Sequence, residues 1–72
     1  MNNKIDSTKF SHKLKELRKA MSLTQSEVAK HLQISASTYA NWELGRAEPS
    51  IQDIFRLIEF FEIEANDLFN IY

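Results

Sequence analysis

Residues 23–44, LTQSEVAKHLQISASTYANWEL, determine how this chain folds. They predict two short helices, at about residues 24–32 and 35–44, joined by a tight connection at Gln33 and Ile34. Two short helices that cross steeply across such a connection form a helix-turn-helix unit. The spacing alone leaves a second interpretation open, because short helix pairs also occur in bundles where they serve only packing.

Local signals set the ends of these two helices. Thr24 and Glu27 fit a capping box, in which each side chain satisfies a backbone N–H group of the other residue. Ser35 is placed to cap the second helix. Gly45 is placed to end it, because only glycine adopts a left-handed backbone at little cost.

Further helices flank this pair. A helix at about residues 8–20 is predicted from an apolar stripe at Phe10, Leu14, Leu17 and Met21. Downstream, Ser50 caps the most apolar helix, which carries Ile51, Ile54, Phe55, Leu57, Ile58 and Phe61. A last turn or two is expected from about Ala65. We expect residues 1–7 to be a disordered tail and residues 8–72 to form a single domain.

The composition limits the chain to one small all-α domain. It has 72 residues, no cysteine, one glycine and one proline. The lack of cysteine excludes a disulfide framework and a cysteine–zinc site, and so little turn chemistry argues against a β-rich fold. No apolar run approaches the roughly 20 residues needed to span a bilayer, and the first ten residues do not resemble a signal peptide. We therefore expect a cytoplasmic protein without a membrane partner.

Charge is distributed unevenly, although the net charge is only −1. Residues 1–46 carry eight basic and four acidic side chains, whereas residues 47–72 carry one basic and six acidic side chains. A basic half joined to an acidic half can give one face a positive potential. The pattern mildly favours a protein that binds nucleic acid over the alternative, in which these residues are ordinary surface charges.

Catalytic motifs are missing from the sequence. Only His12 and His31 are present as histidines, and they are far apart along the chain. No nucleophile motif, glycine-rich phosphate loop or pair of histidines at i, i+4 spacing occurs. We therefore expect no enzyme activity, no cofactor and no metal site.

Four motifs together resemble one known family. They are LKELR at residues 14–18, LTQSEVA at 23–29, STYANWELGR at 37–46 and EPS at 48–50. As a set they closely resemble the Cro and phage-repressor family, also called the xenobiotic-response-element (XRE) family of helix-turn-helix regulators, over about residues 10–69. The resemblance implies a compact five-helix, lambda-repressor-like domain. It also implies binding to operator DNA, usually as a two-fold dimer, with the second helix of the motif in the major groove.

The resemblance also implies which residues meet double-stranded DNA. Phosphate contacts are expected from Gln25, Ser35 and Arg46, and base contacts from Ala36, Ser37 and Asn41. Asn41 suits adenine, Ser37 suits several bases, and Ala36 offers only a methyl group. The alternative for each residue is a solvated helix surface with no partner.

Other positions have structural roles in the family. Arg18 and Glu43 match a partly buried salt bridge that ties the first helix to the end of the reading helix. Gln33 stands where glycine is common, and so a left-handed backbone there would bear roughly 1 kcal/mol of strain. Leu44 stands where a polar residue often meets the DNA backbone, and its side chain is expected to contribute only packing. Tyr39 and Trp42 are expected in the core rather than as platforms for single-stranded bases.

The C-terminal region holds more large apolar residues than a small core can bury, which marks an interface. The candidates for a homodimer interface are Phe60, Ile63, Phe69, Ile71 and Tyr72. A homodimer matches two operator half-sites, and repression is the default sign of regulation, with activation left open. The alternative is a protein-interaction module or antitoxin that binds a toxin or antirepressor through this region.

Overall fold

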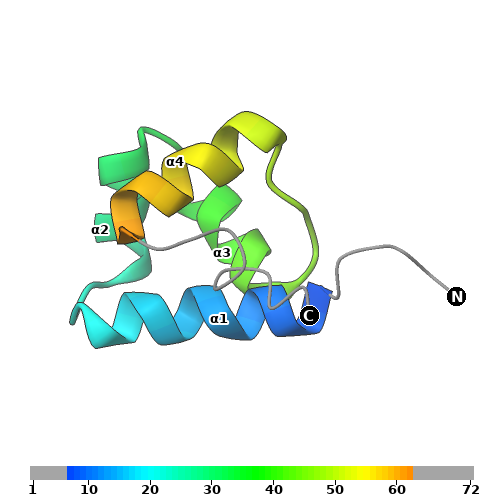
Figure 1. The fold of residues 1–72 in the computed structure, drawn as a ribbon, viewed down its shortest axis with the longest axis horizontal. Coiled ribbons are helices and arrows are strands. Elements are labelled where there is room, and N and C mark those ends of the chain that lie inside the picture. The colour runs from blue at the N-terminus through cyan, green and yellow to red at the C-terminus, as the bar shows by residue number, and fades with distance from the viewer. Residues whose placement is uncertain (1–6, 63–72) are drawn as a thin grey trace, which may run out of the picture.

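Four helices make up the part of the chain that the structure, a computed structural model, describes, namely residues 7–62. They are α1 (Ser7–Ala20), α2 (Gln25–Leu32), α3 (Ala36–Leu44) and α4 (Ile51–Phe61). In Figure 1, α1 and α4 lie on opposite sides of α2 and α3. The all-α prediction is therefore confirmed for these residues, and α1 begins one residue earlier than expected. The fifth helix expected from about Ala65 lies outside the described residues.

Hydrogen-bonded caps start the helices where the sequence predicted them. The Glu27 backbone N–H donates to Thr24 Oγ1 at 3.1 Å, and the Thr24 N–H donates to Glu27 Oε1 at 2.8 Å. This second bond is the main cause that lowers the pKa of the Glu27 carboxyl. Ser50 and Asp53 form the same reciprocal pair at the start of α4.

Left-handed residues end α2 and α3. Gln33 has φ 59° and ψ 42°, and the Ile34 N–H that follows donates to the Ala29 carbonyl oxygen at 3.0 Å. Gly45 has φ 74°, and the Arg46 N–H donates to the Asn41 carbonyl oxygen at 3.0 Å. Both ends thereby satisfy carbonyl groups that have no partner inside the helix. Gln33 thus adopts the left-handed conformation for which glycine is common at this position, and the turn is kept without a glycine.

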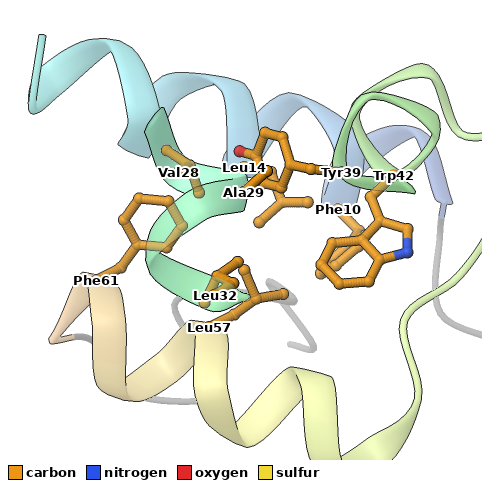
Figure 2. Packing of buried hydrophobic residues seen from close by; sticks show 9 residues of the cluster. All are labelled: Phe10, Leu14, Val28, Ala29, Leu32, Tyr39, Trp42, Leu57 and Phe61. Atoms are coloured by element: carbon orange, nitrogen blue, oxygen red, sulfur yellow. The ribbon is translucent and has the colours of Figure 1, made fainter. Parts of the chain in front are cut away.

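All four helices contribute to one core, in which nine apolar side chains meet (Figure 2). The Tyr39 and Trp42 rings pack edge to face with their centroids 6.0 Å apart, as expected for core residues. These nine residues are Phe10, Leu14, Val28, Ala29, Leu32, Tyr39, Trp42, Leu57 and Phe61.

Some apolar residues lie outside this core. Met21, predicted as part of the buried stripe of α1, is 45% exposed, because α1 ends at Ala20 and the chain turns there. Ile51 and Phe55 on α4 are 65% and 64% exposed. Phe55, one of the apolar residues of the helix capped by Ser50, is therefore not a core residue.

Replacing Gln33 with glycine should stabilise the protein. A left-handed conformation costs a residue with a Cβ about 1 kcal/mol, and glycine adopts it freely. Urea unfolding of Gln33→Gly should therefore give a higher free energy of unfolding than the parent. Gln52→Gly, at an exposed position in α4, is the matched control and should be destabilising. A loss of stability in Gln33→Gly would contradict the strained turn.

Candidate nucleic-acid interface

A salt bridge joins α1 to the end of α3. Arg18 Nε donates to Glu43 Oε2 at 2.7 Å, and Arg18 Nη2 donates to Glu43 Oε1 at 3.0 Å. The side chains are only 12% and 3% exposed, respectively. Two parallel bonds from a guanidinium to a carboxylate fix direction as well as distance. The predicted ion pair is therefore formed, and it sets how α3 lies against α1.

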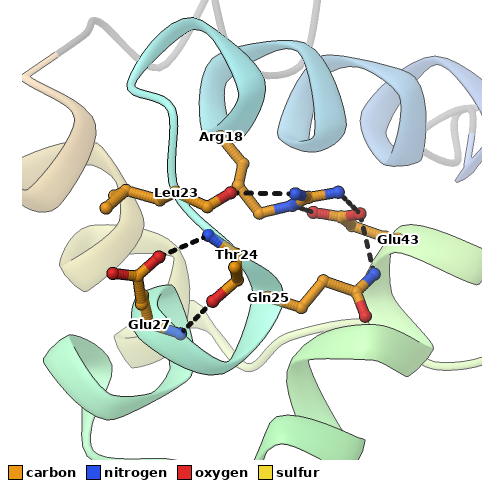
Figure 3. A network of polar contacts seen from close by, with 6 residues as sticks. All are labelled: Arg18, Leu23, Thr24, Gln25, Glu27 and Glu43. Atoms are coloured by element: carbon orange, nitrogen blue, oxygen red, sulfur yellow. Dashed lines mark hydrogen bonds and ion pairs between the residues drawn. The ribbon is translucent and has the colours of Figure 1, made fainter.

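Gln25, the first residue of α2, joins the same carboxylate (Figure 3). Its Nε2 donates to Glu43 Oε1 at 3.0 Å, while Arg18 Nη1 donates to the Leu23 carbonyl oxygen at 3.0 Å. One carboxylate thus holds α1, the start of α2 and the end of α3 in fixed relation. A glutamine amide has two N–H donors and an acceptor oxygen. A phosphate contact by Gln25 therefore remains compatible with its bond to Glu43, and it stays a prediction.

The ionised form of Glu43 is favoured despite its burial. Burial disfavours the charged carboxylate, but the hydrogen bonds from Arg18 and Gln25 and the nearby Tyr39 hydroxyl outweigh burial, so the pKa of Glu43 lies below its ordinary value. The hydrogen bond to Glu43 is the main cause that raises the pKa of Arg18. Burial raises the pKa of the Tyr39 phenol, whose hydroxyl has no hydrogen-bond partner among the described residues. All three groups therefore keep their usual charge states at neutral pH.

A second contact ties α3 to α1. The buried Ser11 hydroxyl donates to the Trp42 carbonyl oxygen at 3.0 Å. A Cβ added at Gly45 would lie 3.3 Å from the same Ser11 oxygen, so the chain leaves α3 close against α1. With the inner side of α3 fixed in this way, its outer side is left for contacts outside the chain.

The predicted base-reading residues share α3. Ala36 and Ser37 are exposed in its first turn, and Asn41 is half-buried one turn later. The predicted phosphate-binding residues lie at the boundaries of the helix-turn-helix: Gln25 starts α2, Ser35 caps α3, and Arg46 is exposed just after Gly45. The structure thus brings both sets onto the α2–α3 unit, although the contacts themselves stay predictions.

The Ser35 hydroxyl is already engaged within the chain. It accepts from the Thr38 backbone N–H at 3.0 Å and donates to Thr38 Oγ1 at 2.8 Å. A hydroxyl has a single proton to donate. A direct phosphate contact by this side chain would therefore require the bond to Thr38 to break.

Sequence reasoning did not predict which apolar residues of the described part are exposed. Most residues of the expected dimer interface lie outside that part. Phe60 is half-buried, with its ring centroid 5.3 Å from that of His31 and 5.0 Å from that of Phe61. The other four interface candidates, Ile63, Phe69, Ile71 and Tyr72, lie outside the described residues. Among the described residues, Ile51, Phe55 and Leu44 are instead the most exposed large apolar residues, and Leu44 is 62% exposed rather than packed. Its i+7 spacing from Ser37 was the signal that could have placed it on the outer face.

Residues 7–62 contain no group of three histidine, cysteine, aspartate or glutamate side chains that could hold a metal ion. No helix in the same part of the chain is long and apolar enough to cross a bilayer.

Comparison with known proteins shows which proteins this chain is similar to. The model of a family described as helix-turn-helix matches residues 14–68. An uncharacterised HTH-type transcriptional regulator of Methanocaldococcus jannaschii is 36% identical over 60 residues, which cover 83% of this chain and 91% of that protein.

Two other relatives are longer than this chain. The HTH-type transcriptional activator BcrR of Enterococcus faecalis is 30% identical over 82% of the chain and 29% of its own length. The cryptic phage CTXphi transcriptional repressor RstR of Vibrio cholerae is 30% identical over 82% of the chain and 53% of its own length. The chain thus spans about a third and about half of these two relatives.

Solved structures show the same fold. The restriction-modification controller protein C.AhdI from Aeromonas hydrophila has a TM-score of 0.81 and 33% identity, covering 89% of this chain and 97% of that one. The SOS-response transcriptional repressor LexA from Eubacterium rectale has a TM-score of 0.84 and 29% identity, covering 96% and 73%.

Breaking the Arg18–Glu43 pair should be strongly destabilising. Arg18→Met leaves the Glu43 carboxylate buried without its charged partner, which should cost about 3 kcal/mol of unfolding free energy. The double variant Arg18→Met/Glu43→Leu should recover much of this stability, because no unpaired buried charge remains. Chemical denaturation of the parent, both single variants and the double variant measures the coupling. Additive effects of the two substitutions would show that the side chains do not stabilise each other.

Acid should remove the contribution of Glu43. Because the pKa of Glu43 is lower in the folded chain than its ordinary value of 4.5, its contribution is fully present above that value and is lost as the pH falls through the folded pKa. The difference in unfolding free energy between the parent and Glu43→Gln should therefore shrink below about pH 4.5. Glu59→Gln, an exposed acid on α4, measures the effect of removing a surface charge alone. A difference that grows on acidification would contradict this assignment.

Proposed function

We propose, from the premise that this chain belongs to the helix-turn-helix family of Cro and phage-repressor-like (XRE) regulators, that it represses transcription as a homodimer on a palindromic operator. The coarser part of this function follows from the family: the protein is a DNA-binding regulator of transcription, in a family that is generally not enzymatic.

The arrangement of α3 carries the proposal. The Arg18–Glu43–Gln25 network fixes the inner side of α3 against α1 and α2, while Ser37 and Asn41 lie on the other side. A recognition helix held in this way can enter the major groove as a rigid unit. Gln25 and Arg46 lie at the ends of the motif, where the phosphate backbone would pass. We therefore assign base reading to Ala36, Ser37 and Asn41, and phosphate binding to Gln25, Arg46 and backbone N–H groups.

A homodimer is supported by symmetry and by exposed apolar surface. Two protomers related by a two-fold axis match two operator half-sites about 34 Å apart. Ile51 and Phe55 on α4 add exposed apolar surface to the interface proposed from the C-terminal residues. Repression is supported by the relative named as a phage repressor. We assign the protein to the cytoplasm because its proposed target is DNA.

A second candidate function uses the same apolar surface. Ile51 and Phe55 could instead bind a different protein, such as a toxin or an antirepressor. A chain that sediments as a monomer without DNA and with DNA would favour this candidate over the homodimer.

Selection from randomised duplexes tests the proposed function. The purified protein is incubated with the library at physiological salt, and the bound duplexes are sequenced. We expect an enriched palindrome with half-sites about 10 base pairs apart from centre to centre. No enrichment would overturn operator binding, and a single unrepeated half-site would overturn the dimer.

Two variants should separate base reading from phosphate binding. Asn41→Ala should cost about 1–3 kcal/mol at the preferred operator and relax the preference at one base pair of each half-site. Arg46→Ala should weaken binding to all sequences alike and reduce the log–log salt slope by about 0.9 for each phosphate that is no longer neutralised. Binding isotherms on preferred and substituted operators at several salt concentrations distinguish the two. An unchanged sequence preference in Asn41→Ala would contradict its role as a reader.

A further inference from the structure

The DNA interface proposed above contains only one positive charge. Of the two side chains assigned to phosphate, Gln25 is neutral and Arg46 is charged. Arg18 lies close to Gln25, but its guanidinium is paired with the Glu43 carboxylate. Neutralisation of phosphates by lysine and arginine supplies a large share of the affinity of a protein for DNA. A further cation is therefore expected near Gln25 and Arg46.

Lys15 lies on the side of α1 that meets α3. Ser11, Lys15 and Arg18 occupy positions i, i+4 and i+7, which form one row along a face of the helix. On one side of Lys15 in this row, Ser11 Oγ donates to the Trp42 carbonyl oxygen at 3.0 Å. On the other side, Arg18 Nε donates to Glu43 Oε2 at 2.7 Å. Because both neighbours contact the end of α3, Lys15 lies beside that end.

The fold makes no use of the Lys15 ammonium. The side chain is exposed and makes no hydrogen bond or ion pair with another residue of the described part. His12, Glu16 and Lys19 border it on the outer side of α1, where one acid and one further lysine offset each other. A lysine ammonium is a compact charge on a flexible four-carbon stem. Lys15 is therefore a cation that is free to reach an anion beside the end of α3.

Gln25 lies at one end of this row. Its Nε2 donates at 3.0 Å to Glu43 Oε1, and Arg18 Nη2 donates at 3.0 Å to the same oxygen. Lys15 precedes Arg18 by three residues, or about 4.5 Å along the axis of α1. A phosphate bound by Gln25 would therefore lie close to the Lys15 end of the α1–α3 contact.

Arg46 lies at the other end of the row. Gly45 ends α3 so close to α1 that an added Cβ would lie 3.3 Å from Ser11 Oγ, and Arg46 follows directly (Figure 1). Lys15 follows Ser11 by four residues, or about 6 Å along the axis of α1. Lys15 therefore lies between the two residues to which phosphate binding is assigned.

We propose that Lys15 binds a DNA phosphate that lies between the phosphates bound by Gln25 and Arg46. A DNA backbone that passes both of these residues also passes the end of α3, where the ammonium is unpaired. Contacts to phosphate fix the position of a protein on the duplex and carry no base preference. Lys15 thus adds affinity at every sequence. The inference rests on the proposed function, because it concerns the same bound DNA.

Lys13 provides a matched control. It carries the same charge on the same helix, but residues two positions apart on a helix do not face each other. Lys13 therefore does not share the row of Ser11, Lys15 and Arg18. Lys15→Gln and Lys13→Gln remove the same charge from α1 and differ only in the side from which it is removed.

The salt dependence of binding measures whether the charge meets a phosphate. Association constants are measured for the parent and both variants, on the selected operator and on an unrelated duplex, between about 50 and 200 mM salt. The log–log slope of Lys15→Gln should be smaller by about 0.9, the value for one phosphate. Its deficit in affinity should therefore shrink about 3.5-fold over this fourfold range of salt. Lys13→Gln should keep the slope of the parent.

Replacement of single phosphates locates the contact. Each phosphate of a half-site is replaced in turn by an uncharged methylphosphonate. One replacement should weaken binding by the parent and by Lys13→Gln, and should leave binding by Lys15→Gln unchanged. This phosphate should lie between the two positions at which Gln25→Ala and Arg46→Ala are insensitive. Circular dichroism of Lys15→Gln should match the parent, because the side chain is exposed.

The outcomes separate this inference from the proposed function. A protein that binds no duplex overturns both. Binding without an enriched operator overturns the proposed function, and the slopes on the unrelated duplex then decide the role of Lys15. An unchanged slope in Lys15→Gln overturns only the phosphate contact. The same holds if Lys13→Gln loses as much slope, or if the insensitive phosphate lies outside the interval between those of Gln25 and Arg46.

Discussion

Much of this structure depends on the Glu43 carboxylate, which is almost fully buried between Arg18 and Gln25. A buried charge is tolerated only when partners satisfy it, and here the three groups come from three helices. Because the bonds from Arg18 are directional, α3 has one favoured orientation relative to α1. The orientation of α3 is thereby fixed before the protein binds DNA. Less of the chain then has to become ordered on binding, which lowers the entropic cost of binding.

The position of Gln25 links this internal network to the proposed DNA contacts. Its amide donates inward to Glu43, while its place at the first turn of α2 is where a helix N-terminus attracts an anion. A phosphate bound there would meet a side chain that is already held in place. The same residue can therefore serve the fold and the interface.

The reading face itself is built from small and neutral side chains. Ala36, Ser37 and Asn41 present few hydrogen-bonding groups, and Arg46, a charged residue proposed for phosphate contact, lies outside α3. Specificity in such a protein would depend on shape and methyl contacts as much as on hydrogen bonds. This division suits the charge distribution along the chain, in which basic residues are concentrated in the half that contains the helix-turn-helix.

The sequence by itself determined the helices, their caps and their connections, because these depend on contacts within a few residues. The capping boxes of Thr24 and Ser50 and the end of α3 at Gly45 are all local, and the structure contains each of them. The motif resemblance also supplied the pair of Arg18 and Glu43, although 25 residues separate them. Only the tertiary structure decided that Gln25 binds Glu43, and that Leu44 and Phe55 stay exposed while Leu57 is buried. Burial depends on how the helices pack against one another. Helical periodicity identifies the apolar face of each helix, but it does not identify the helix against which that face packs.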